Sequence, residues 1–156
     1  MKATELLKRQ HREVKGLFRT TKKATAAKAR RSGMEEIASK LLAHMAIEED
    51  IFYPAVQGIG TKKTAKLVPE AYEEHHVAKL VLAELPKVDP EDERFEAKMT
   101  VLEELIEHHV EEEEEEMFKA AQKLGAERLT ELGDEMEAAF APEPAKAKIK
   151  AAGGSR

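Results

Sequence analysis

Apolar residues recur at every third or fourth position through most of this chain of 156 residues, which is the spacing that one face of an α-helix requires. Alternating β-branched runs and Asn-Gly turns, the usual signs of strands and hairpins, are nearly absent. Aromatic residues make up only 4% of the chain and there is no Trp, so a core would be built from Leu, Ile, Val, Ala and Met. The pattern predicts an all-α fold.

The first two long helices are expected in the N-terminal part of the chain. The first spans roughly residues 3–28, and Ser32-Gly33 separates it from the second. The second ends between Pro54 and Gly60, where helix-breaking residues gather.

Two further long helices are expected after residue 60. The third ends at Pro86, because proline cannot continue a helix. The fourth begins with Asp89 as N-cap and Pro90 at the first helical position. It runs to about Leu124, where Gly125 stops it.

The connections between these helices are short, which makes consecutive helices antiparallel neighbours. The expected architecture is therefore an up-down-up-down four-helix bundle, followed by a short fifth helix near residues 126–140. We assign residues 1–140 to this bundle. Residues 141–156 are rich in Pro, Ala and Lys, and we expect them to form a disordered tail.

Composition excludes several kinds of site. The chain has no Cys, so it cannot hold a disulfide, a thiolate zinc site or an iron–sulfur cluster. Its first fifteen residues contain no apolar signal segment, and no apolar run approaches the ~18 residues of a membrane span. We therefore expect a cytoplasmic protein with no membrane partner.

Histidine and glutamate interrupt the apolar stripes at core-facing positions. Each of the four long helices carries one His in register with its apolar residues, and two of them also carry a Glu. The four stripes are Leu7, His11, Val14, Phe18; Leu41, His44, Glu48, Ile51; Ala71, His75, Ala78, Leu82; and Leu102, Ile106, His109, Glu113, Met117.

Burying these groups without a partner would cost roughly 1–3 kcal/mol each, and more if they are charged. Metal ions remove that cost, and imidazole with carboxylate suits iron, zinc or manganese. Six ligands are too many for one tetrahedral zinc, but they suit two metals about 3.5–4 Å apart with bridging carboxylates. The pattern therefore predicts a two-metal site with open positions. His76 and His108 lie one residue off the stripes, and we expect them behind the ligands or at the surface.

A weak internal repeat joins the second and fourth helices. Both contain His-x-x-x-Glu with an aromatic residue five positions after the Glu, which is Tyr53 in one helix and Phe118 in the other. The His and Glu of each pair lie one turn apart on the same helix face and can ligate neighbouring ions. We interpret the two aromatic residues as core packing, with a wall that keeps water from the site as the alternative.

Four segments together resemble the hemerythrin-like family, also called the HHE cation-binding domain, over nearly all of residues 1–140. They are residues 6–15 (LLKRQHREVK), 44–54 (HMAIEEDIFYP), 73–79 (EEHHVAK) and 108–118 (HHVEEEEEEMF). The resemblance implies a non-haem site of two iron ions, bridged by an oxo group and carboxylates. Carried over residue by residue, it implies as ligands His11, His44, Glu48, His75, His109 and Glu113.

The sequence departs from the oxygen-carrying members in ways that argue against oxygen transport. Those proteins have a second His one turn after the third-helix ligand, where this chain has Lys79. They space the fourth-helix His and carboxylate by five residues, whereas His109 and Glu113 are four apart. Gln10 replaces an Asp that is common before the first ligand, which removes a carboxylate behind the metals. We expect Lys79 to turn outward, since an ammonium beside two metals would be costly.

Three functions remain open from the sequence. The first is a di-iron protein that binds or senses a small molecule such as oxygen, peroxide or nitric oxide. The second is an enzyme that turns over peroxide or nitric oxide at the same irons. The third is a metal-regulated protein that binds nucleic acid or a partner through the basic segment 19–31; the net charge of −5 and the lack of a reading motif argue against it.

Overall fold

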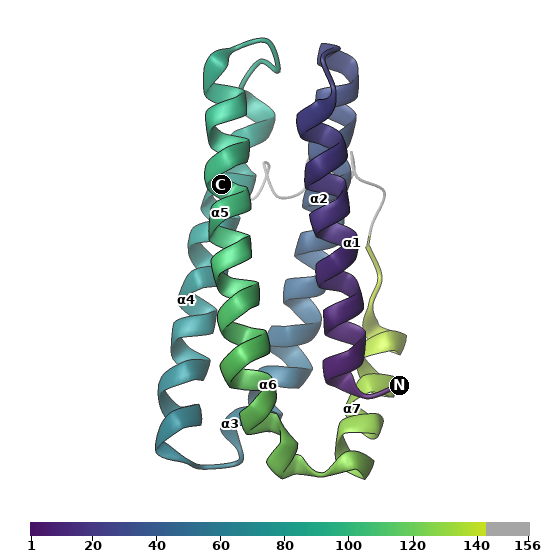
Figure 1. Cartoon of the computed structure of the whole chain (residues 1–156), viewed down its shortest axis with the longest axis vertical. Coiled ribbons are helices and arrows are strands. Elements are labelled where there is room, and N and C mark those ends of the chain that lie inside the picture. Colours follow the sequence, from purple (N-terminus) through teal and green to yellow (C-terminus); the bar gives the residue numbers. More distant parts are fainter. Residues whose placement is uncertain (143–156) are drawn as a thin grey trace.

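Four long helices stand side by side in the computed structural model of this chain, which describes residues 1–142 (Figure 1). They are α1 (Ala3–Lys23), α2 (Ala27–Ile47), α4 (Lys62–Glu84) and α5 (Glu93–Glu112). The described residues contain no strand, and successive long helices run in opposite directions. The expected all-α, up-down-up-down bundle is confirmed. The predicted tail lies, from residue 143 onward, outside the described residues.

Two of the long helices continue through a π-helical turn. After α2 come the π segment η1 (Glu48–Phe52) and α3 (Tyr53–Gln57). After α5 come the π segment η3 (Glu113–Met117), α6 (Phe118–Ala121) and the 3₁₀ turn η4 (Gln122–Leu124). Helical structure thus extends to Leu124 and stops at Gly125, whose φ of 86° favours glycine, as predicted.

The fifth helix, α7 (Ala126–Ala139), packs against α1 and η1 near the N-terminus (Figure 1). Its buried face is formed by Leu129, Leu132 and Met136, which are spaced at helical intervals. The other connection, between α4 and α5, contains the 3₁₀ turn η2 (Leu85–Lys87), so Pro86 does lie where the third helix ends.

The break between the first two helices is not where the sequence predicted it. Ser32 and Gly33 lie inside α2, and the chain instead turns at residues 24–26, where Ala24 and Ala26 are extended. Arg30 stabilises this turn by donating hydrogen bonds to the carbonyls of Ala24 and, across the bundle, of Pro90. No helix-breaking residue marks this position, so a local signal was lacking.

The start of the fourth helix is also corrected. Asp92, and not Asp89, is the N-cap of α5, and its side chain accepts a hydrogen bond from the backbone N–H of Arg94. Asp89 accepts instead from the N–H of Glu91 in the preceding turn, at 2.9 Å. Both aspartates have the local chemistry of a cap, and only the three-dimensional turn selects between them.

The core is divided into two apolar clusters. One lies at the end near α7 and includes Leu7, Phe52 and Phe118. The other lies towards the opposite end and includes Phe18 and Phe95. The core-facing histidines lie where the two clusters meet along each helix, so they form a polar layer in the middle of the bundle. Within the described residues, no helix is long and apolar enough to cross a membrane.

Candidate metal centre

The structure brings all six residues predicted as metal ligands into this layer. Their side chains are almost completely buried, with residue exposures of 0–7%. They come from α1, α2 with η1, α4, and α5 with η3, namely His11, His44, Glu48, His75, His109 and Glu113. Every long helix therefore contributes, as the stripe positions predicted. That these residues hold metal ions stays a prediction.

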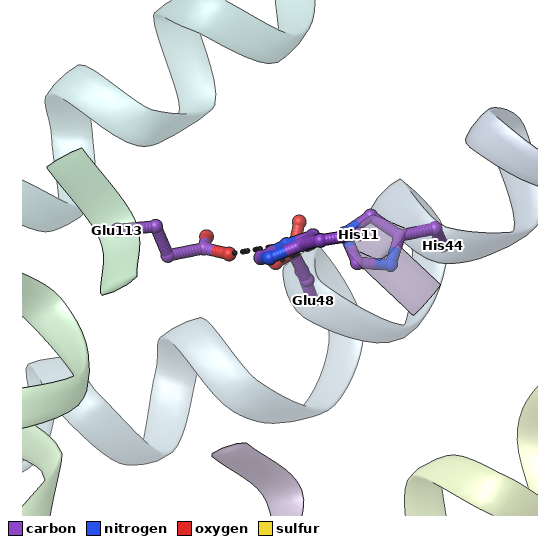
Figure 2. A group of neighbouring side chains, drawn as sticks. All are labelled: His11, His44, Glu48 and Glu113. Atoms are coloured by element: carbon purple, nitrogen blue, oxygen red, sulfur yellow. Dashed lines mark ion pairs between the residues drawn. The ribbon is translucent and has the colours of Figure 1, made fainter. Parts of the chain in front are cut away.

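One half of the layer combines two histidines with one oxygen from each glutamate. The Nε2 atom of His11 lies 3.1 Å from Oε1 of Glu113, and Nε2 of His44 lies 3.3 Å from Oε2 of Glu48. The four residues offer ligand atoms that all lie within 4.8 Å of one another. Figure 2 shows Glu113 reaching towards His11, with His44 and Glu48 beside them. The group can surround one cation.

The other half uses the remaining oxygens of the same two glutamates. Nε2 of His75 lies 3.0 Å from Oε1 of Glu48, and Nε2 of His109 lies 3.3 Å from Oε2 of Glu113. The two Nε2 atoms are 3.2 Å apart. Each carboxylate thus faces both halves, which is the arrangement that bridges two metal ions.

The outer nitrogen of each histidine is held by an oxygen. Because carboxylate and amide oxygens only accept hydrogen bonds, each Nδ1 must donate, and in the neutral ring Nε2 keeps its lone pair for the centre. The acceptors come from different helices, and the distances are 2.6–2.8 Å for the pairs His11–Glu114, His44–Gln10, His75–Glu49 and His109–Glu74.

Three buried atoms of the first half have no hydrogen-bond partner, although they lie close together. They are Nε2 of His11, Oε2 of Glu48 and Oε1 of Glu113. Such atoms are costly to bury, and they point at one another without the geometry of a hydrogen bond. A cation between them would satisfy all three. The chemistry and positions of these residues therefore fit a metal ion.

The charges of the centre are strongly coupled. Burial alone would lower the pKa of His11, but the adjacent carboxylates of Glu113 and Glu114 raise it to about 9. The pKa of His109 is also raised: burial lowers it, and the charge of Glu113 more than offsets this. Burial raises the pKa of Glu48, but the charge of His44 and hydrogen bonds hold it well below its usual range. Without metal, protons on His11 and His109 thus help to balance the charge of the nearby carboxylates.

Sequence reasoning missed the polar role of Tyr53. Its hydroxyl lies 3.2 Å from the Nε2 atoms of His75 and His109, and it donates hydrogen bonds to Glu113 at 2.5 Å and Glu48 at 3.2 Å. These are the four donor residues of the second half. Burial and the two carboxylates raise the pKa of Tyr53 well above its ordinary value, so the hydroxyl keeps its proton at neutral pH.

The π turn explains how Tyr53 reaches the centre. Five residues complete a π turn, and the N–H of Tyr53 bonds to the carbonyl of Glu48, so both side chains lie on one face. The same geometry places Phe118 above Glu113 in η3. The spacing of five in the weak repeat was the available signal, and it was interpreted as packing or as a wall against water, not as a hydrogen-bonding role. π turns are often found at functional sites.

The neighbouring residues singled out in the sequence lie around the centre. Lys79 turns outward, as expected, and pairs with Glu49 at 2.8 Å. His76 is exposed on α4, and the side chain of His108 is 72% exposed on α5. Gln10 brings no carboxylate behind the metals, but its amide oxygen accepts the Nδ1 hydrogen bond of His44. An amide oxygen accepts a hydrogen bond as a carboxylate does, so the ring of His44 is still held.

Comparisons with known proteins agree with this geometry. The chain is 30% identical over 141 residues to the uncharacterized proteins Rv2633c of Mycobacterium tuberculosis and Mb2666c of Mycobacterium bovis, spanning 88% of this chain and 84% of each relative. A crystal structure of a hemerythrin HHE cation-binding domain-containing protein from Mycobacterium kansasii, an Rv2633c homologue, matches with a TM-score of 0.78 and 27% identity, covering 97% of this chain and 89% of that one. Residues 2–121 match the family described as the hemerythrin HHE cation-binding domain. The chain belongs to this family.

Proposed function

We propose that this chain is a non-haem di-iron protein that binds or senses oxygen or a related small molecule such as peroxide or nitric oxide. The proposal rests on one observation, which is that the buried donor residues form two adjacent groups that share two glutamates. One half has two imidazole nitrogens and an oxygen from each of two buried carboxylates, and the other joins His75 and His109 to Glu48, with Glu113 beside His109. The domain that does this is residues 1–140, and we place it in the cytoplasm.

The donor set supports iron. Imidazole and carboxylate suit iron, zinc and manganese, and the absence of Cys removes the thiolates that favour structural zinc. Bound iron would supply redox chemistry and open coordination positions for a small ligand. The chain's own residues would fix that centre: the two glutamates span both halves, and the Nδ1 hydrogen bonds hold the four rings in place.

The space beside the donor atoms supports a very small ligand. A cavity of about 20 Å³ is lined by all four histidines of the centre and by apolar side chains such as Leu41 and Met45. This is room for about one water-sized molecule, so oxygen, peroxide or nitric oxide fits and an organic substrate does not.

A path from the surface leads towards that cavity. A groove of about 440 Å³ lies between α1 and α5, and it shares His11, Val14, Ile106 and Val110 with the lining of the inner cavity. A small ligand that enters the groove is thus separated from the centre by one layer of side chains, which rotamer changes can open on fast timescales.

The metal content tests the proposal directly. We expect elemental analysis of the purified protein to find about two irons per chain, as the six donors and two halves require. The absorption spectrum should show bands of oxo-bridged iron that disappear on reduction and change again in air. One tightly bound zinc per chain, with no such bands, would contradict the proposal.

The hydroxyl of Tyr53 supports a second candidate, an enzyme that turns over peroxide. It is a buried O–H that keeps its proton and lies against the donor atoms of one half. Such a group can deliver a proton to a small ligand in the centre. If the chain is an enzyme, it will evolve oxygen from hydrogen peroxide at an electrode, and Tyr53→Phe will lower that rate while the iron content stays near that of the wild type. A pure binder will evolve none.

A further inference from the structure

A second group of potential ligands lies on the surface of α4 and α5. The Nε2 atom of His108 is 3.5 Å from Oε2 of Glu112 and 3.9 Å from Oε2 of Glu74. The three residues offer ligand atoms that all lie within 4.8 Å of one another. The side chain of His108 is 72% exposed, and those of Glu74 and Glu112 are each 29% exposed, so the group is open to solvent. One imidazole and two carboxylates can hold a divalent cation such as Fe²⁺.

The surface group is joined to the buried centre through Glu74. One oxygen of Glu74 faces His108, and the other accepts the hydrogen bond from Nδ1 of His109 at 2.6 Å. A small cavity of about 10 Å³ lies behind the group, and Glu74, Glu112, His109 and Glu113 all line it. Glu113 is buried, and its Oε2 lies 3.3 Å from Nε2 of His109. An ion at the surface group would therefore have carboxylate oxygens both beside it and behind it.

No basic side chain competes for this group. Among residues 1–142, neither Glu74 nor Glu112 forms an ion pair with a lysine or an arginine. The groove between α1 and α5 is also acidic, but there Arg12 and Lys15 lie among the glutamates. The only residue of the centre in the lining of the groove is His11, whose Nδ1 is already paired with Glu114. The surface group therefore offers a cation ligands that no lysine or arginine of the described chain competes for.

We propose that Glu74, His108 and Glu112 form a surface cation site that captures ferrous iron and passes it to the buried centre. The ion exchanges its ligands stepwise, from His108 and Glu112 at the surface to Glu113 inside, with no change of oxidation state. Glu112 and Glu113 both line the small cavity behind the surface group, so the ion can pass from one to the other there. This inference rests on the proposed function, because it assumes that the centre holds iron.

The rate of iron uptake tests the site separately from the activity of the loaded protein. Full-length metal-free protein is mixed with Fe²⁺ without oxygen, and a coloured ferrous chelator is added after set times to count the iron that is protected. In the double variant His108→Gln/Glu112→Gln, we expect uptake at low Fe²⁺ to slow by about tenfold, since a site of opposite charge raises association rates by at least that factor. The final iron content should equal that of the wild type.

A matched variant controls for charge. His76→Gln/Glu111→Gln removes the same side-chain types from exposed positions on the same two helices, outside the surface group. We expect it to take up iron at the wild-type rate. Equal rates in the wild type and the His108/Glu112 variant would overturn the loading site alone. A slower rate only in the control would also overturn it, because the ion would then enter elsewhere. A wild-type chain that protects no iron would instead refute the proposed function, and the loading site with it.

Direct binding gives a second measurement. Iron-loaded protein, whose centre is already filled, is titrated with Mn²⁺ and the free ion is followed by electron paramagnetic resonance. We expect weak binding of about one Mn²⁺ per chain, since carboxylate and imidazole ligands suit that ion. The binding should be lost in the His108→Gln/Glu112→Gln variant and kept in the control variant. Equal binding by both variants would overturn the proposal.

Discussion

At the scale of single residues, the centre depends on pairs of contacts made by each histidine. Nε2 faces the other donors of the centre, while Nδ1 is held by an oxygen from another part of the chain. This second contact fixes both the tautomer and the orientation of the ring. Within the described residues, the exposed His76 lacks both contacts, so its ring is not held in the orientation that a metal ligand needs.

This difference predicts unequal effects of two histidine substitutions on neighbouring helices. We expect His109→Ala to lower metal affinity by more than about a hundredfold, because loss of a residue merely behind a ligand already costs roughly 10- to 100-fold. His76→Ala should leave the affinity near that of the wild type. Competition with a chelator, followed by elemental analysis, measures both. Similar losses in the two variants would show that the assignment of the α4 ligand is wrong.

The raised pKa of His11 predicts that the metal-free protein is less stable at high pH. A folded pKa of about 9 against an ordinary value of 6.5 means that the folded state binds the proton more tightly. The resulting stabilisation is complete below pH 6.5 and is lost as the pH rises through 9, by at most about 3 kcal/mol for this residue. Urea unfolding of chelator-treated protein at pH 6.5 and pH 9.5 measures it.

The variant His11→Gln provides the control for this pH dependence. Glutamine does not titrate, so the free energy of unfolding of this variant should fall less between the two pH values than that of the wild type. The histidines at 75 and 109 also have raised pKa values, so some decrease remains. A wild-type protein that is equally stable at both values would contradict the prediction.

At the scale of helices, two details decide how the bundle is built. The π turns let α2 and α5 place a glutamate and an aromatic residue on one face at a spacing of five. The close approach of α1 and α2 is set by Gly33, which lies against Thr21. Glycine is needed there for space and not to end a helix, which is why its presence misled the boundary prediction.

Alanine at two glycines in these helices should have opposite effects. A Cβ at Gly33 would overlap several side-chain atoms of Thr21, including its Cβ, so rotation alone cannot relieve the contact. We expect Gly33→Ala to lower the free energy of unfolding by about 1–3 kcal/mol. Gly16→Ala in α1 meets no atom within 4 Å and should raise stability by up to about 1 kcal/mol, the ordinary gain within a helix. Denaturant unfolding of both variants measures these changes. A Gly33→Ala variant more stable than the wild type would show that the predicted overlap with Thr21 does not occur.

At the scale of the whole molecule, a polar layer separates two apolar clusters, and all four long helices contribute to it. Burying two carboxylates and four imidazoles in this position is costly unless their charges are balanced. The layer therefore couples the stability of the bundle to what occupies the centre.

Removing the metal should thus destabilise the entire bundle. In the unfolded chain the six donor residues are far apart, so this state binds the ions far more weakly than the folded protein does. At free metal a thousandfold above the dissociation constant, each bound ion contributes about 4 kcal/mol to the free energy of unfolding. Thermal unfolding at pH 7, before and after chelator treatment, should show a lower midpoint for the metal-free protein. Equal midpoints would mean that metal does not bind in the core.

Residue spacing along the chain was enough to predict the all-α class, the antiparallel bundle and the inward position of the six candidate ligands. These conclusions rest on spacings within one helix, and a helix face is defined by the chain that forms it. For this reason His44 and Glu48 could be placed together from their separation of four residues. The short connections then limited the possible order of the helices.

The packing of the helices sets which donors share a half of the centre and which oxygen holds each histidine ring. The hydrogen bond from His11 to Glu114 joins residues 103 positions apart, and no local spacing predicts such a pair. Tyr53 reaches the centre because of a π turn, which interrupts the 3.6-residue period of an α-helix on which the predictions rested. The turn after α1 depends on the contact of Arg30 with Pro90 across the bundle. These features follow from how the helices pack, because packing brings together side chains that the sequence keeps apart.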